Sequence, residues 1–161
     1  MRKRRNYLIF IIIALISLVI ISSAFLYPYG KKKSNLSVDA MYILKNSESE
    51  GKVNISAIIY LTNTGGKSDD IKIVAYLLEK WKGIAVEKKE ISIGEVKGGV
   101  TKEISTYMEI GNGSYQLEVL VFENELLKIK GGGWIETKYY ESDGIYYTDT
   151  SIQDIYFKRM H

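Results

Sequence analysis

The sequence predicts an all-β domain, an antiparallel β-sandwich of about seven to nine short strands, preceded by one transmembrane α-helix. Three observations support this fold class. Apolar and polar residues alternate over most of the chain after residue 35, turn residues interrupt this pattern at regular intervals, and no stretch there has the 3.6-residue periodicity of a helix. The 161 residues suffice for one folded core and one membrane anchor.

The N-terminal segment is predicted to be a transmembrane signal-anchor. Residues 7–27 contain no charged side chain, and about twenty such residues in a helix span about 30 Å of hydrocarbon. In residues 1–6, Arg2 to Arg5 narrowly outnumber the later cluster Lys31 to Lys33, which favours a cytoplasmic N-terminus. Residues 28–35 then form a juxtamembrane linker. We expect a single-pass protein of the cell membrane whose C-terminal domain lies outside.

A cleaved secretory signal is the alternative interpretation of this segment. Ser22, Ser23 and Ala24 supply small residues that suit a cut after Ala24. Both interpretations place residues 31–161 outside the cytoplasm. A buried core helix is disfavoured, because about twenty uncharged residues beside a basic cluster are unusual in a soluble core.

Charge and composition exclude several classes of protein. Seven of the 22 basic residues flank the apolar segment, whereas all 19 acidic residues follow residue 33, so the domain itself is net negative. A nucleic-acid partner is not expected, because such binding requires a basic face. The absence of cysteine excludes disulfides, thiolate catalysis and cysteine-ligated zinc.

Alternation of apolar residues defines the individual strands. In residues 53–61 the positions Val53, Ile55, Ala57, Ile59 and Leu61 predict one buried face, and residues 71–77 repeat the pattern. Further strands are expected at residues 84–86, 91–96, 101–110, 115–121 and 126–129. Glycine-rich turns separate them at Asn63–Gly66, Gly98-Gly99, Gly111–Gly113 and Gly131–Gly133.

The order of four short motifs resembles the CARDB domains, the cell-adhesion-related immunoglobulin-like sandwiches of prokaryotic surface proteins. The motifs are Asn63-Thr64-Gly65, Val74-Ala75-Tyr76-Leu77, Gly98-Gly99-Val100 and Gly113-Ser114-Tyr115. This resemblance implies an immunoglobulin-like sandwich over residues 36–133 and a role in binding or adhesion at the cell surface.

Residues 134–161 form an aromatic-rich tail that is predicted to pack on the sandwich as a hairpin. Asp143-Gly144 between aromatic runs is a typical hairpin turn. The tyrosines predict either a partner surface or cross-strand pairs that cover the sandwich. The residues concerned are Tyr139, Tyr140, Tyr146 and Tyr147.

No catalytic, cofactor or metal site is predicted. The single histidine, His161, is the last residue and a poor general base, and Gly131–Gly133 lack the lysine of a phosphate-binding loop. Carboxylates could serve a glycosidase, but the pattern singles out no pair. The candidates are Asp69, Asp70, Glu123, Glu125, Glu141 and Asp143. Asp69 and Asp70 alone supply too few oxygens for calcium.

Three N-x-Ser sequons predict possible glycosylation at Asn35, Asn54 and Asn112. Asn112 lies in a predicted turn and is the best acceptor. The leading hypothesis for function is therefore a non-catalytic, membrane-anchored module outside the cytoplasm, which binds a protein or polysaccharide or acts as a structural spacer. The alternatives are an accessory subunit of a membrane complex and a carboxylate-dependent surface hydrolase.

Overall fold

The computed structural model describes residues 32–49 and 51–160. The segment predicted to be the anchor lies outside this range. Residues 33–161 form one compact unit. The described residues contain eight β-strands, and they include no helix long and apolar enough to cross a membrane.

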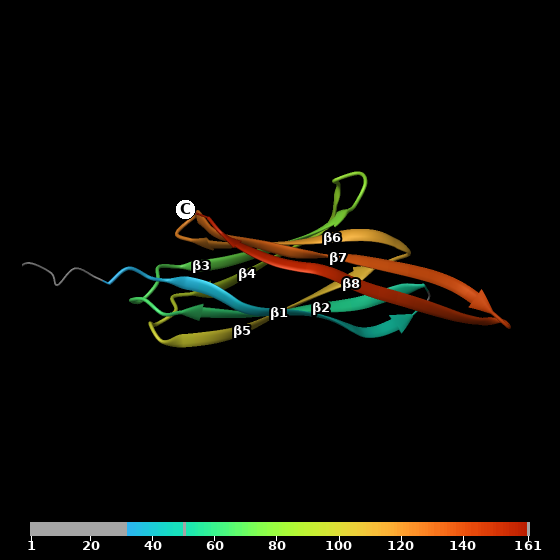
Figure 1. Ribbon diagram of the computed structural model, residues 1–161, viewed down its shortest axis with the longest axis horizontal. Coiled ribbons are helices and arrows are strands. Elements are labelled where there is room, and N and C mark those ends of the chain that lie inside the picture. The colour runs from blue at the N-terminus through green and yellow to red at the C-terminus, as the bar shows by residue number, and fades with distance from the viewer. Residues whose placement is uncertain (1–31, 50, 161) are drawn as a thin grey trace, which may run out of the picture. The chain divides into compact units, whose positions relative to one another are not determined.

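Two antiparallel sheets form a sandwich (Figure 1). The three-stranded sheet has the order β1-β2-β5, with β1 at Leu36–Ser49, β2 at Lys52–Asn63 and β5 at Val100–Ile110. The five-stranded sheet has the order β4-β3-β6-β7-β8. Its strands are β3 at Ile71–Glu79, β4 at Ala85–Gly94, β6 at Gly113–Glu123, β7 at Leu126–Ser142 and β8 at Ile145–Arg159. The prediction of an all-β, immunoglobulin-like sandwich is confirmed.

The core lies between the two sheets and is filled by every second residue of the central strands. In β2 the five alternating positions from Val53 to Leu61 are all buried, as predicted. In β3 the same holds for Ile71, Ile73, Ala75 and Leu77. Each large aliphatic side chain removed from water contributes about 1.5–3 kcal/mol. This core stabilises a domain that has no disulfide, because the chain contains no cysteine.

Two strands differ from the expected pattern because they lie at sheet edges. The segments predicted at 84–86 and 91–96 are one strand, β4, whose middle residues Glu87–Glu90 are charged. β4 pairs only with β3, so an edge position tolerates this charged stretch. β1, which had not been expected as a strand, pairs with β2 over almost its whole length.

The glycines at 131–133 lie inside β7, not in a turn as predicted. A Cβ atom at Gly131 would overlap the ring of Phe157, and one at Gly132 would overlap the carbonyl oxygen of Leu117. Close packing of the neighbouring strands explains these glycines. β7 continues to Ser142, and the hairpin predicted at Asp143-Gly144 joins it to β8. Residues 134–159 thus extend the five-stranded sheet.

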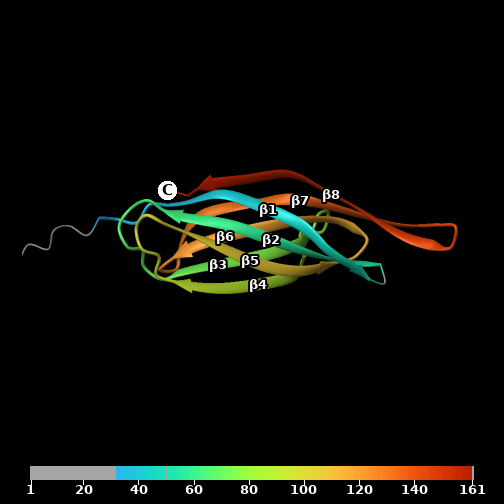
Figure 2. The same ribbon diagram turned by 90° about the horizontal axis from the view of Figure 1, so that it is seen from below.

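The sandwich has two ends with different contents (Figure 2). At one end, here called the Lys33 end, the Gly66 amide donates to the Lys33 carbonyl and the Met160 amide donates to the Lys128 carbonyl. The opposite end, here called the far end, holds the turn at Gly51, residues 80–84, residues 111–112 and the tip of the β7–β8 hairpin. The chain therefore enters the domain and completes its last strand at the same end.

Candidate binding site

The predicted tyrosine surface is partly present at the tip of the β7–β8 hairpin. Tyr140 and Tyr147 lie opposite each other in the register, and their rings stack with centroids 5.6 Å apart and an interplanar angle of 19°. Both side chains remain exposed, at 52% and 42%. This pair thus combines the two interpretations, because it is a cross-strand pair and also leaves a large aromatic surface open to a partner.

The other two tyrosines do not extend this pair in the described part of the domain. Tyr139 alternates with Tyr140 along β7, and its ring lies beside Gly51 in the β1–β2 turn. It is half-buried and belongs to the opposite face of the hairpin. The backbone of Tyr146 pairs with Glu141, but its side chain lies outside the described residues.

A pocket that the sequence had not indicated lies beside this hairpin and contains both tryptophans of the chain. Its volume is 260 Å³. The turn after β3 contributes Lys80 and Trp81, and the central part of β7 contributes Trp134. Its other lining residues are Ser114, Tyr115, Ile135, Glu136, Ser151 and Gln153. Four segments distant in the sequence thus form one site.

The Lys80 ammonium group lies between the two indole rings. Its Nζ atom is 4.7 Å from the centroid of Trp134 and 5.2 Å from that of Trp81. Both distances are within the range of cation–π attraction. The Lys80 backbone amide also donates to the Ser114 carbonyl at 2.9 Å, which fixes the turn against β6. Trp134 is half-buried in the sheet, whereas Trp81 is 84% exposed.

Most polar side chains that line the pocket have no hydrogen-bond or ion-pair partner among the described residues. Within the described part of the chain, the side chains of Ser114, Ser151 and Gln153 make no hydrogen bond and no ion pair, and Lys80 has no carboxylate partner. Glu136 instead pairs with Lys138 at 3.6 Å. The pocket therefore offers one positive charge, neutral hydrogen-bonding groups and two aromatic surfaces to a ligand.

The pocket and the tyrosine pair share the outer face of the five-stranded sheet. Along β7 this face presents Trp134, Glu136, Lys138 and Tyr140, because alternate residues point to one side. Their partners on β8 are Gln153, Ser151, Asp149 and Tyr147. A continuous strip of aromatic and polar groups, here called the outer strip, thus runs from the pocket to the hairpin tip.

Ion pairs occupy the same sheet face closer to the Lys33 end. Lys130 lies 2.6 Å from the Glu118 carboxylate, and this hydrogen bond raises the pKa of Lys130 above its ordinary value. Lys88 likewise pairs with Glu90 at 2.5 Å, and that contact raises the pKa of Lys88. These cations already have carboxylate partners, unlike Lys80.

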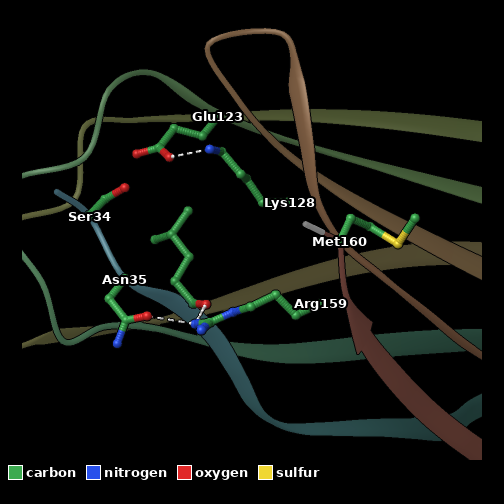
Figure 3. A pocket seen from close by; sticks show the side chains of 7 residues that line it. Ser34, Asn35, Glu123, Lys128, Arg159 and Met160 are labelled. Carbon is green, nitrogen blue, oxygen red and sulfur yellow. Dashed lines mark hydrogen bonds and ion pairs between the residues drawn. The ribbon is translucent and has the colours of Figure 1, made fainter.

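A second pocket, of 190 Å³, lies at the Lys33 end and is used for structure (Figure 3). The Arg159 guanidinium donates to Asn35 Oδ1 at 2.8 Å and also to the Leu36 carbonyl. These bonds tie the end of β8 to the start of β1. Across the pocket, the buried Glu123 carboxylate accepts from the Asp69 amide at 3.2 Å and lies 3.5 Å from Lys128 Nζ.

The three sequon asparagines differ in how their amides are used. Asn35 accepts from Arg159 and donates to Thr64 Oγ1 at 2.6 Å, so both ends of its amide are engaged. Asn54 donates to Ser47 Oγ at 3.2 Å. Asn112 is exposed, and its Oδ1 accepts from the Tyr139 amide at 3.2 Å. Glycosylation at any of them stays a prediction.

The acidic residues are spread over both ends of the domain. Asp69, Asp70, Glu123 and Glu125 lie at the Lys33 end, where Glu125 is 3.6 Å from Lys72. Glu141 and Asp143 lie at the far end, in and beside the hairpin turn. In residues 32–49 and 51–160, no three His, Asp or Glu side chains form a group that could hold a metal ion.

The fold and the outer strip define an immunoglobulin-like β-sandwich domain with a candidate binding face. A family model matches residues 35–131, and the chain belongs to this family, which is described as a domain of unknown function, DUF7490. The match ends inside β7. Trp134 and all of β8 follow it, so part of the pocket is built by residues beyond the family's matched range.

Solved structures support the fold. A β-glucuronidase from glycoside hydrolase family 2 matches 68% of this chain with 13% identity and a TM-score of 0.54, and the match covers 12% of that protein. Bacteroides uniformis β-glucuronidase 2 matches 73% of this chain with 13% identity and a TM-score of 0.56, over 16% of its own length. A glycosyl hydrolase family 2 member from Bacteroides cellulosilyticus DSM 14838 matches 73% of this chain with 11% identity and a TM-score of 0.55, over 17% of its own length.

This chain therefore spans less than a fifth of the length of these structures. The likeness shows a shared β-sandwich fold, corresponding to one small part of each glycosidase. No curated protein matches the chain.

Proposed function

We propose that this chain is a non-catalytic binding module outside the cytoplasm, anchored by residues 7–27 and bound to its partner through the outer strip. The observation that supports this most directly is the position of the aromatic groups. Trp81, Tyr140 and Tyr147 are exposed at the far end, whereas the residues that follow the proposed anchor begin at the Lys33 end. A partner at the far end would meet the domain on the side away from its attachment.

The composition of the outer strip suits binding. Aromatic side chains supply large contact area at low entropic cost, and they are enriched where proteins bind partners. The exposed Trp81 costs solvation energy in the free domain, because its large apolar surface faces water. Contact with a protein or polysaccharide of the cell envelope would remove this cost. The resemblance to CARDB adhesion domains agrees with the same role and remains a proposal.

Membrane topology is tested by cysteine labelling, for which the cysteine-free chain gives a clean background. Lys97→Cys places a thiol on an exposed loop of the domain, and Lys3→Cys places one before the apolar segment. In intact cells, a membrane-impermeant maleimide should label the first variant and not the second. Labelling of Lys3→Cys alone would refute the proposed orientation.

Partner binding is tested with the full chain immobilised in mild detergent and exposed to solubilised envelope material. Trp81→Ala combined with Tyr140→Ala should abolish retention of a component that the unmodified chain retains. Tyr107→Ala is the matched control, because Tyr107 is 65% exposed on β5 of the other sheet. Equal loss in the control, or no loss in the double variant, would exclude the outer strip as the binding face.

A further inference from the structure

We propose that the pocket formed by Lys80, Trp81 and Trp134 binds a carboxylate-bearing saccharide, with a sugar ring on Trp81 and the sugar carboxylate on Lys80. This inference rests on the proposed binding function and names the ligand class for the same surface. Three properties of the pocket lead to it: the positive charge of Lys80, which has no carboxylate partner among the described residues, the exposed flat surface of Trp81, and the neutral polar side chains of Ser114, Ser151 and Gln153 in its lining.

The positive charge of Lys80 selects an anionic group. Glu136, the acidic residue in the pocket lining, is paired with Lys138. Within the described residues, the Lys80 ammonium interacts with the two indole rings and has no carboxylate partner. Cation–π contacts stabilise the ammonium without neutralising it. A ligand carboxylate at this position would form a charge-assisted hydrogen bond with the unused ammonium protons.

The exposed indole of Trp81 selects a flat partner with apolar C–H groups. Trp81 lies in the turn between β3 and β4 and is 84% exposed, although such side chains are normally packed. A pyranose ring presents a face of C–H bonds to an aromatic ring and directs its hydroxyl groups sideways. It can therefore cover the indole while its hydroxyls remain free to form hydrogen bonds.

The remaining lining of the pocket fits those hydroxyl groups. Ser114, Ser151 and Gln153 are neutral, can both donate and accept, and have no side-chain partner in the part of the chain that the structure describes. A peptide that binds by strand addition pairs its backbone with an open strand edge. The pocket instead lies on a sheet face. β6 and β7 each pair with a strand on both sides, and the edge strand β8 contributes the side chains of Ser151 and Gln153 to the lining.

The dimensions suit an oligosaccharide with one residue in the pocket. The 260 Å³ volume is below the range of about 300–1,000 Å³ for pockets that enclose a drug-sized ligand. From Trp134 to Tyr140 the outer strip continues for six residues of β7, or about 20 Å at 3.3 Å per residue. Further sugar residues could therefore reach the stacked pair of Tyr140 and Tyr147.

The test measures binding of the full chain in detergent to three probes by calorimetry and tryptophan fluorescence. The probes are an oligogalacturonate, a neutral cello-oligosaccharide of equal length and a glutamate-rich peptide. We expect the oligogalacturonate to bind at least about tenfold more tightly than the neutral probe, since one charge-assisted contact of about 1.4 kcal/mol gives that ratio. Its affinity should fall with added salt.

Variants assign the binding to the pocket. Lys80→Gln should remove the preference for the acidic over the neutral saccharide, and Trp81→Ala should weaken binding of both. Lys97→Gln controls for loss of an exposed positive charge at the other end, and Tyr107→Ala controls for loss of an exposed aromatic ring. Trp81 and Tyr107 are both largely exposed, so circular dichroism should show an unchanged fold in both variants.

Several outcomes would overturn the inference: no binding of the oligogalacturonate, equal or tighter binding of the acidic peptide, or binding that both pocket variants leave intact. These outcomes can be distinguished experimentally from a failure of the proposed function. If Trp81→Ala with Tyr140→Ala still abolishes envelope retention while no saccharide binds, only the ligand class is wrong. If the saccharide binds but Lys97→Cys is not labelled in intact cells, only the proposed location is wrong.

Discussion

Replacement of Asn63 by aspartate should strongly destabilise the domain in a pH-dependent way. Asn63 is the last residue of β2 and is fully buried. Its Oδ1 accepts from the amides of Asn35 and Gly65, both at 3.0 Å. Its Nδ2 donates to the carbonyls of Gly66 at 2.6 Å and Val96 at 2.9 Å. One side chain thus connects the residue before β1, the turn after β2 and the loop before β5.

Asn63→Asp keeps the shape and both acceptor bonds but loses both donors. The Gly66 carbonyl oxygen would then lose this partner, and a buried group left unsatisfied costs about 1–3 kcal/mol. The Val96 carbonyl oxygen would lose one of two partners, because it also accepts from the Ser68 amide at 2.9 Å. The introduced carboxylate would also face these two oxygens in a buried site, which adds an electrostatic penalty. We expect a loss of about 2–4 kcal/mol at pH 7, which is a large part of the usual stability of a domain.

The pH dependence follows from the protonation state of the introduced carboxyl. Burial opposite two carbonyl oxygens raises its pKa in the folded state above about 3.9, the value in the unfolded chain. The neutral form can donate one hydrogen bond and carries no charge. The destabilisation should therefore be smallest below about pH 4 and should grow as the pH rises through the folded-state pKa.

The assay is urea unfolding of the full chain in detergent, followed by tryptophan fluorescence at pH 3.5 and pH 7. Asn54→Asp is the matched control, because the Asn54 amide makes one exposed hydrogen bond to Ser47, and we expect it to cost less than about 0.5 kcal/mol. If the two variants lose equal stability at pH 7, or if the loss in Asn63→Asp does not change with pH, the reasoning is refuted.

Three further predictions concern packing and charge. Thr137 Oγ1 is buried and has no hydrogen-bond partner among the described residues, so Thr137→Val should raise the free energy of unfolding by about 1 kcal/mol in urea titrations; a decrease would contradict this. Gly132→Ala should lower the free energy of unfolding by about 2–3 kcal/mol in the same assay, because the added Cβ would overlap the backbone of β6. Gly133→Ala is the control and should lower it less, because its Cβ would meet Ile155 at 3.3 Å. Hydrogen bonds from Lys45 and Thr148 lower the pKa of Glu48, so the stabilising effect of the Glu48 carboxylate is present above its unfolded-state pKa of about 4.5 and is lost as the pH falls through the folded-state pKa. Thr148→Val should raise the pKa of Glu48 measured by NMR. An unchanged pKa would show that the Thr148 hydroxyl does not stabilise the carboxylate.

The parts of the fold that the sequence predicted are those in which burial controls residue type. β2 and β3 pair with strands on both sides, and their strict alternation follows from one face in the core. Edge strands lack this constraint, which explains why the sequence predicts two short strands in place of β4, whose middle residues are charged. The sequence predicts a turn at the glycines of β7, because glycine clusters are typical of turns. In the structure these positions require glycine because of close contact with Phe157 and the β6 backbone, and this contact exists only in the assembled sheet.

The candidate site was less predictable, for the same reason. The tyrosines at the hairpin were indicated by their local density beside Asp143-Gly144. The tryptophan pocket was not, because Trp81 and Trp134 are 53 positions apart in the printed sequence and meet only through the order of β3, β6 and β7. The signal available in the sequence was that both tryptophans are present in the domain and that Lys80 precedes one of them.

The placement of Lys33 and the outer strip at opposite ends has a mechanical consequence. A ligand held at the far end and an anchor attached before Lys33 would load the sandwich along its strands. β1 is hydrogen-bonded to β2 from Leu36 to Ser49, and these bonds are perpendicular to the strands. A pulling force would therefore act on them in shear, so that many bonds must break together. This arrangement resists tension far better than one in which a hairpin is opened one bond at a time.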